Sequence, residues 1–178
     1  MRSFFLLFFL IFSIGSIHAE NLKPSKGIIA TSNPYASKAA YEVIKNGGNA
    51  IDASIAVQLV LTLTEPQATG IGGGAFMLYW DAKKSKLFSI DGREKAPSLA
   101  SEDLFLNKDG KNIKFYPDAV VGAKSVGVPG IIRLLEETHK KFGKLEWSEL
   151  FTYAIELSEN GFSISPALHN TLGYLNYL

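Results

Sequence analysis

Apolar residues recur at helical spacing in two neighbouring segments near the start of the chain, just after a short β-prone run at residues 27–31. In the first segment they have the i, i+3, i+4, i+7 spacing of one buried helix face, at Ala36, Ala39, Ala40 and Val43. Ser32-Asn33-Pro34 supplies its cap and a first-turn proline, and Gly47-Gly48 supplies its end. The second segment, from about Ala50 to Leu63, is apolar on nearly all sides. It predicts a central helix that is too short to span a bilayer.

A β-hairpin is predicted to follow the two helices. Aromatic and aliphatic residues from Ala75 to Trp80 and from Leu87 to Asp91 predict two strands. Lys83-Lys84-Ser85 lies between them and predicts a hairpin turn. A glycine-rich stretch, Gly70 to Gly74, precedes the first strand. Residues 92–97 follow the second strand as a loop, because glycine and proline bracket them.

Three further helices are predicted in the last third of the chain. The first opens at Pro129 and ends at Gly143, the second runs from near Ser148 to Asn160, and the third starts at Ser165-Pro166. Their apolar faces are formed by Ile131, Leu134, Leu135 and Phe142, by Leu150, Phe151, Ala154, Ile155 and Leu157, and by Leu168, Leu172 and Leu175. Residues 98–125 show no sustained period, so no firm structure is assigned to them.

The first residues have the pattern of a secretory signal peptide. Met1-Arg2 is a short basic start, and an apolar run from Phe4 to Phe12 follows it. A membrane anchor needs about 18 or more nearly uninterrupted apolar residues, and polar residues interrupt this run from Ser13 onward. We therefore expect a signal peptide at residues 1–19, no stable membrane anchor, and export of residues 20–178 to a periplasm or out of the cell.

Composition excludes several kinds of chemistry and partner. Charges are balanced, with 18 Lys and Arg against 17 Asp and Glu. The chain therefore lacks the excess positive charge that would hold nucleic acid. The chain has no cysteine, which excludes disulfides, thiolate metal sites and a cysteine nucleophile. The three histidines, at positions 18, 139 and 169, have no spacing that places two on one helix face. We therefore expect no metal site and no cofactor.

The glycine-rich stretch has one alternative interpretation. Gly70 to Ala75 satisfies the dinucleotide-binding pattern G-x-G-x-x-A, which would make the chain an exported nucleotide-binding domain. That pattern requires a strand before the glycines and a helix after them. The predicted order here is helix, glycines, strand. Glycines that permit tight packing or a positive φ are therefore the favoured interpretation.

Two charged residues invite a functional interpretation. Asp52 lies three residues after the predicted cap Asn49. A carboxylate there is stabilised by the helix N-terminus, which favours a structural role over a catalytic one. Arg93 lies on a glycine-flanked loop at a strand end, and its planar guanidinium can hold a carboxylate through two parallel hydrogen bonds. An ion pair with Asp91 or Glu94 is the alternative role for this arginine, and the sequence does not separate the two.

Together these residues resemble the gamma-glutamyltransferases, also called gamma-glutamyltranspeptidases or glutathione hydrolases, over nearly all of residues 20–178. The ordered matches are Ala30-Thr31-Ser32-Asn33-Pro34, Gly47-Gly48-Asn49-Ala50-Ile51-Asp52-Ala53, Gly70-Ile71-Gly72-Gly73-Gly74-Ala75-Phe76-Met77, Asp91, Arg93-Glu94, Ala96-Pro97, Gly127-Val128-Pro129-Gly130, and Gly143-Lys144-Leu145 before Trp147. The resemblance implies an α+β fold of the N-terminal nucleophile hydrolase type, an αββα sandwich that is incomplete here. Residues 20–178 would form the front of its large subunit.

The resemblance also implies a chemistry. In that family one precursor cuts itself into a large and a small subunit, and the new N-terminal threonine of the small subunit attacks gamma-glutamyl amides such as glutathione. The glutamyl group then passes to water or to an amino-acid or peptide acceptor. The family arginine that holds the α-carboxylate of the glutamyl group corresponds to Arg93. Next to it, Gly92 replaces an aromatic residue found in many members.

The catalytic residues of the family have no counterpart in this sequence. Its threonines, at positions 31, 62, 64, 69, 138, 152 and 171, include no adjacent pair, so the Thr-Thr-His processing site is absent. We therefore expect no catalytic residue and no activity from this chain alone, and we expect its partner to be the small subunit of the same precursor. The alternatives are a truncated chain that serves as a binding or pairing subunit, and a related cephalosporin-type acylase that cleaves glutaryl side chains.

Overall fold

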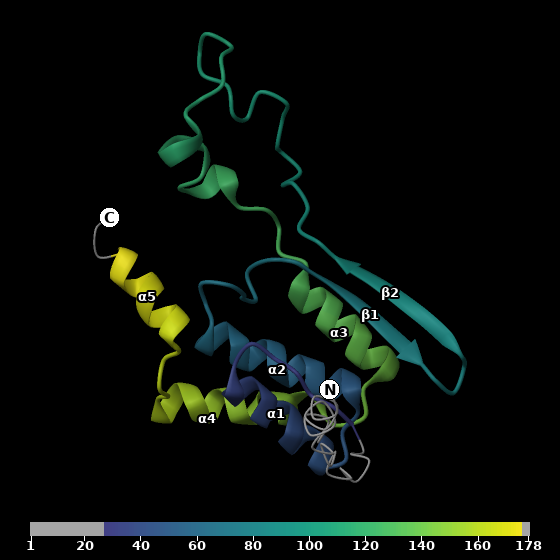
Figure 1. Cartoon of the computed structure of the whole chain (residues 1–178). Helices are drawn as coiled ribbons and strands as arrows, with labels where there is room; N and C mark the ends of the chain where they lie inside the picture. Colours follow the sequence, from purple (N-terminus) through teal and green to yellow (C-terminus); the bar gives the residue numbers. More distant parts are fainter. Residues whose placement is uncertain (1–26, 176–178) are drawn as a thin grey trace, which may run out of the picture.

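The computed structural model describes residues 27–175, so the predicted signal peptide at residues 1–19 lies outside the described residues. Figure 1 shows three parts: a layer of helices, a two-stranded hairpin beside it, and an irregular excursion that extends away from both. Within residues 27–175, no helix is both long and apolar enough to cross a membrane.

Helices α1 (Pro34–Lys45) and α2 (Ala50–Thr64), both predicted from the apolar pattern, pack against each other. The Asn33 side chain caps α1 by accepting a hydrogen bond from the backbone N–H of Tyr35 at 3.0 Å. Asn49 and Asp52 form a capping box at the start of α2. The central position predicted for α2 is confirmed, because α1, α3 and α4 all contact it.

The C-terminal part contains α3 (Ile131–Phe142), a 3-10 turn η3 (Trp147–Phe151), α4 (Thr152–Asn160) and α5 (Pro166–Leu175). The prediction of one helix from near Ser148 to Asn160 is wrong at its start, because η3 precedes α4 there. The backbone N–H of Glu149 bonds to the carbonyl of Glu146 at 3.1 Å, an i to i+3 bond that tightens this first turn.

The core lies between these helices and the inner face of the hairpin. Its fully buried members are apolar residues of α1, α2, α3, η3 and α4, and they include Ala36, Ala39, Ile51, Ile55, Ala56, Val60, Ile131, Leu134, Leu135 and Leu150. Each of them lies on a helix face or in an apolar segment that the sequence pattern predicted. These core residues therefore pack against segments that the chain itself contains, whereas Ile155, predicted on the apolar face of its helix, is 51% exposed.

The hairpin consists of β1 (Ala75–Asp81) and β2 (Lys86–Gly92), which pair antiparallel with Ala75 opposite Gly92. Both predicted strands are confirmed. β1 ends one residue later than predicted, and β2 starts one residue earlier and ends one residue later. Their sheet is the only one among residues 27–175, so the described region holds part of the two-sheet arrangement that the family resemblance implies. On the inner face, the rings of Tyr79 and Phe88 lie 4.8 and 4.9 Å from that of Phe142 in α3.

The β-prone run at residues 27–31 forms no strand. Its last residue, Thr31, instead serves the start of α1. The Thr31 hydroxyl donates a hydrogen bond to the Asn33 carbonyl at 2.7 Å and lies 2.7 Å from the hydroxyl of Ser37. Local side-chain bonds of this kind compete with strand pairing at the approach to a helix.

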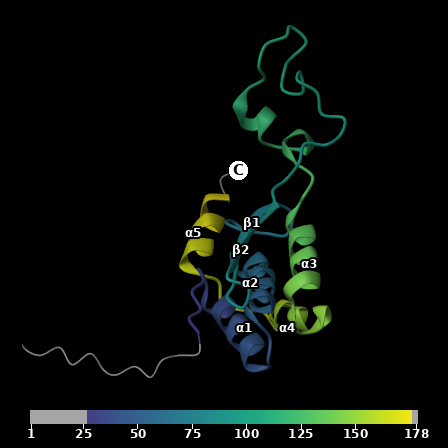
Figure 2. The same cartoon turned by 90° about the vertical axis from the view of Figure 1, so that its right-hand side faces the viewer.

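Residues 93–128 form the excursion, which leaves the hairpin at the end of β2 and returns at the start of α3 (Figures 1 and 2). It contains two short turns, η1 (Phe115–Ala119) and η2 (Ala123–Ser125). At its base, Lys95 and Val128 pair through two backbone hydrogen bonds of 3.2 and 2.8 Å. Its irregular backbone agrees with the lack of a sustained apolar period in residues 98–125.

Candidate functional site

Arg93 is the first residue after β2, at the point where the chain leaves the sheet. Its backbone N–H donates a hydrogen bond to Asp91 Oδ1 at 2.9 Å, which holds the turn. Its side chain is 67% exposed, and Nη1 lies 3.3 Å from Oε2 of Glu94. The predicted alternative of an ion pair is therefore present with Glu94, whereas Asp91 contacts only the backbone of Arg93. A guanidinium carries five N–H donors, so one ion pair leaves other donors for a ligand.

The glycine-rich stretch packs directly against this loop. A Cβ atom on Gly74 would lie 2.8 Å from the Glu94 nitrogen and 2.8 Å from the Gly92 oxygen, and one on Gly127 would lie 2.9 Å from Glu94 Cβ. Only glycine permits the backbone to approach this closely. The Arg93 loop is therefore held between two segments that are far apart in the sequence.

The start of α3 closes the loop from the other side. The backbone N–H groups of Gly130 and Ile131 donate to the carbonyl of Gly73 at 3.1 and 3.2 Å. A Cβ on Gly130 would lie 2.8 Å from the carbonyl oxygen of Arg93. These contacts couple the glycine-rich stretch, the Arg93 loop and α3 into one unit.

The structure gives the glycine-rich stretch a packing role. Residues 70–74 lie between α2 and β1, so the order is helix, glycines, strand, as predicted and opposite to the order that a dinucleotide site needs. Of the two favoured explanations, close packing applies at Gly73 and Gly74, whereas a Cβ on Gly70 or Gly72 would meet nothing within 4 Å. Positive φ does not apply in this stretch, because the positive-φ glycines are Gly47, Gly110, Gly122 and Gly161.

Asp52 has the structural role that its position predicted. Its side chain is fully buried, and Oδ2 accepts a hydrogen bond from the Asn49 N–H at 2.9 Å. The same carboxylate accepts from the N–H of Lys144 at 3.0 and 3.1 Å, and His139 Nε2 lies 3.7 Å away. Asp52 thereby ties the start of α2 to the segment after α3.

A second buried carboxylate, that of Glu65, was missed by the sequence analysis. It accepts hydrogen bonds from Asn33 Nδ2 at 2.7 Å and from Gln67 Nε2 at 2.6 Å, and joins the start of α1 to the end of α2. These bonds, that from Asn33 above all, hold the pKa of Glu65 below its ordinary value. The sequence predicted a cap within Ser32-Asn33-Pro34, but nothing in the pattern indicates that the Asn33 amide reaches residue 65.

His139 has a structural role in the segment that follows α3. His139 donates from Nε2 to the Leu145 carbonyl at 2.9 Å, and its ring packs edge-on against Trp147 at 5.3 Å. Among residues 27–175, no group of three or more His, Cys, Asp or Glu side chains is arranged to hold a metal ion. His18 lies outside the described residues.

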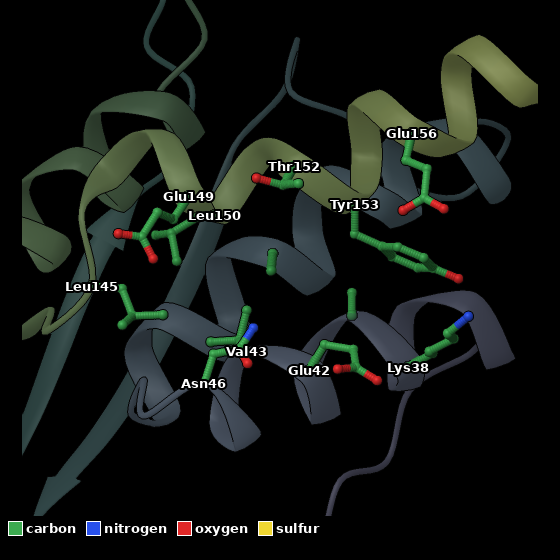
Figure 3. A pocket seen from close by; sticks show the side chains of 12 residues that line it. Lys38, Glu42, Val43, Asn46, Leu145, Glu149, Leu150, Thr152, Tyr153 and Glu156 are labelled. Carbon is green, nitrogen blue, oxygen red and sulfur yellow. The ribbon is translucent and has the colours of Figure 1, made fainter.

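A separate hollow of about 410 Å³ lies between α1 and the η3–α4 segment (Figure 3). Lys38 and Glu42 of α1 face Tyr153 and Glu156 of α4 across it. Lys38 Nζ lies 5.2 Å from the centre of the Tyr153 ring, a cation–π contact. Arg93, the residue predicted to bind substrate, does not line this hollow. The hollow is therefore separate from the predicted substrate site.

Known structures define the class of fold. The chain resembles the gamma-glutamyltranspeptidase of Pseudomonas nitroreducens with a TM-score of 0.78 and 40% identity, over 84% of this chain and 43% of that one. It also resembles the cephalosporin acylase of Bacillus halodurans with a TM-score of 0.67 and 34% identity, over 82% of this chain and 27% of that one. The chain therefore has the α+β fold of the N-terminal nucleophile hydrolases to which these enzymes belong.

Sequence comparison then identifies the family. The profile of the gamma-glutamyltranspeptidase family matches residues 36–175. The chain is 43% identical over 164 residues to the glutathione hydrolase proenzyme of Bacillus subtilis strain 168. The aligned region covers 85% of this chain and 28% of that protein. The chain belongs to the gamma-glutamyltranspeptidase family, as its motifs predicted. It spans 28% of the length of this curated relative.

Proposed function

We propose that residues 20–178 are the front of the large subunit of an exported gamma-glutamyltransferase precursor, which acts in a periplasm or outside the cell. The complete enzyme would cleave gamma-glutamyl amides such as glutathione and transfer the glutamyl group to water or to amino-acid and peptide acceptors. The observation that supports this most is the exposed Arg93 at the end of β2, held by glycines in a chain of this family.

Arg93 is proposed to bind the α-carboxylate of the glutamyl group. Its side chain is 67% exposed, and its backbone is restrained by Asp91 and by the packing of Gly74 and Gly130. A planar guanidinium on a rigid turn suits the two parallel hydrogen bonds that a carboxylate accepts. The sequence match to the family motif Arg-Glu-x-Ala-Pro at residues 93–97 supports the same role.

The small subunit of the precursor would supply the reaction itself. Its N-terminal threonine would attack the gamma-glutamyl amide, with its own α-amine as the base, and form an acyl-enzyme. The present chain has no adjacent threonines, and the curated relative of which it spans 28% carries the name proenzyme. We therefore propose that this chain alone is inactive and that the small subunit is its partner.

Kinetics of the full-length precursor test this proposal. Arg93→Ala should weaken glutamyl binding by roughly 10- to 100-fold, because charged hydrogen bonds contribute about 1.5–3 kcal/mol. Unchanged KM and kcat for a gamma-glutamyl anilide would discard the role of Arg93. Release of the chromogenic amine by the purified 178-residue chain would refute the proposed inactivity of the chain alone.

Two other functions are separated by simple measurements. The 34% identity to a cephalosporin acylase favours a glutaryl-cleaving enzyme as the second candidate, and faster hydrolysis of a glutaryl amide than of a gamma-glutamyl amide would select it. A truncated binding or pairing subunit is the third. DNA that continues in frame past Leu178 into a Thr-Thr-His site would exclude it, whereas a stop codon would support it.

A further inference from the structure

The Glu94 carboxylate lies in a slot whose walls are glycines. A Cβ on Gly73 would lie 3.2 Å from Oε1, one on Gly74 would lie 2.5 Å from Oε2, and one on Gly127 would lie 2.9 Å from Glu94 Cβ. Side chains at these positions would fill the slot. The carboxylate is therefore confined to one place on the loop, although Glu94 follows the highly exposed Arg93 directly.

Oε2 of Glu94 is buried and accepts no hydrogen bond within residues 27–175. Its cationic neighbour is Arg93, whose Nη1 lies 3.3 Å away. A buried carboxylate oxygen without a hydrogen bond is costly and favours a nearby positive charge. The slot therefore keeps a fixed negative charge directly beside the guanidinium of the proposed substrate-binding residue.

An exposed arginine side chain has many rotamers, and binding a ligand to it requires ordering them. An ion pair to a confined carboxylate reduces this freedom before the ligand arrives. The ion pair joins Glu94 Oε2 to Nη1 of Arg93, and a guanidinium has five N–H donors, so one such contact leaves donors for a ligand. Such an arrangement pre-orients a guanidinium for an incoming carboxylate.

We propose that Glu94 is a positioning residue, which orients the Arg93 guanidinium toward the α-carboxylate of the gamma-glutamyl donor, and that Gly73 and Gly74 hold Glu94 in place. This inference rests on the proposed role of Arg93. It predicts that Glu94 controls how strongly the enzyme prefers donors that carry an α-carboxylate, although Glu94 itself does not touch the substrate.

The preference can be measured directly in the full-length precursor. The ratio of kcat/KM for a gamma-glutamyl anilide to that for the gamma-aminobutyryl anilide, the same donor without its α-carboxylate, reports recognition of this group alone. Glu94→Gln keeps the shape of the side chain but removes its charge. It should lower the ratio by about 3- to 10-fold, mainly through KM, as expected for the loss of one interaction of this kind.

The glycines supply a second variant and a matched control. In Gly73→Ala the new methyl group meets only Glu94 Oε1, whereas in Gly72→Ala it meets nothing within 4 Å. Gly73→Ala should lower the ratio by about 2- to 5-fold, the range of a weakened exposed ion pair. Gly72→Ala should leave it unchanged. Gly73→Ala also tests the inference if Glu94→Gln fails to mature.

Three results separate this inference from the proposed function. If Arg93→Ala abolishes the preference and Glu94→Gln lowers it, but the double variant behaves as Arg93→Ala alone, then Glu94 acts through Arg93. If Arg93→Ala abolishes the preference and neither Glu94→Gln nor Gly73→Ala changes it, the positioning role is overturned while the function of Arg93 stands. If Arg93→Ala leaves the preference intact, both proposals are wrong.

Discussion

The helical layer differs from the hairpin and the excursion in how far its large apolar side chains are exposed to solvent. In the helical layer, residues such as Ile55 and Leu150 are fully buried, and buried carboxylates such as Asp52 have several hydrogen bonds. On the outer face of the hairpin Leu78 is 72% exposed, and in the excursion Leu99 is 94% exposed. The helical layer also exposes some apolar side chains, such as Ile155 at 51%, but it contains the buried core. The outer face of the hairpin and the excursion instead present large apolar side chains to solvent, a feature typical of interaction surfaces.

The proposed substrate-binding loop lies at the boundary between these two regions. Arg93 leaves the exposed hairpin, yet its backbone is held by Gly74 and by Gly130 at the start of α3. The position of Arg93 thus depends on the helical layer, whereas its side chain is exposed to solvent. We infer that the helical layer serves as the support on which this loop is presented.

Truncation of the core gives the largest effect expected from this difference. Ile55→Ala removes a fully buried side chain of α2 and should lower the free energy of unfolding of residues 20–178 by about 2–5 kcal/mol. Leu78→Ala, on the exposed outer face of β1, should change it by no more than about 0.5 kcal/mol. Urea unfolding followed by far-ultraviolet circular dichroism measures both. Equal losses would contradict the distinction between the two regions.

Removal of the Asp52 carboxylate should have the next largest effect. Asp52→Ala deletes the capping box and leaves the N–H groups of Asn49 and Lys144 without their acceptor, at a cost of about 2–4 kcal/mol. Asp52→Asn keeps one acceptor oxygen and should lose less. The same urea titration compares them. An alanine variant as stable as the parent chain would show that this connection between α2 and the segment after α3 contributes nothing.

Acid should weaken the layer through Glu65, with a smaller effect. Hydrogen bonds from Asn33 and Gln67 lower the pKa of Glu65 in the folded chain, so its contribution is complete above the ordinary value of 4.5 and is lost as the pH falls below it. The urea midpoint of the parent chain should fall more steeply in this range than that of Glu65→Gln. Parallel pH profiles would show that Glu65 does not contribute.

Local signals in the sequence predicted most of the fold. Caps at Asn33 and Asn49, the stop at Gly47-Gly48 and the apolar faces locate α1 and α2 correctly, because these features act within a few residues. The 3-10 turn before α4 was missed, since apolar spacing does not distinguish its first turn from an α-helix. The excursion gave no pattern because few of its residues pack against the core.

The surroundings of the site depend on contacts between distant residues. Arg93 was found from residue type, a glycine neighbour and the family motif. The bonds from Gly130 and Ile131 to Gly73 join segments more than fifty residues apart, and no local pattern encodes such a contact. The same is true of the bond between Asn33 and Glu65. The slot around Glu94 was likewise visible only in three dimensions.

A crystal structure of the complete gene product with bound glutamate would test the account most directly. The account predicts that the Arg93 guanidinium lies within about 2.7–2.9 Å of both oxygens of the α-carboxylate, with the Glu94 carboxylate still beside it. A glutamate bound far from this guanidinium would contradict the account.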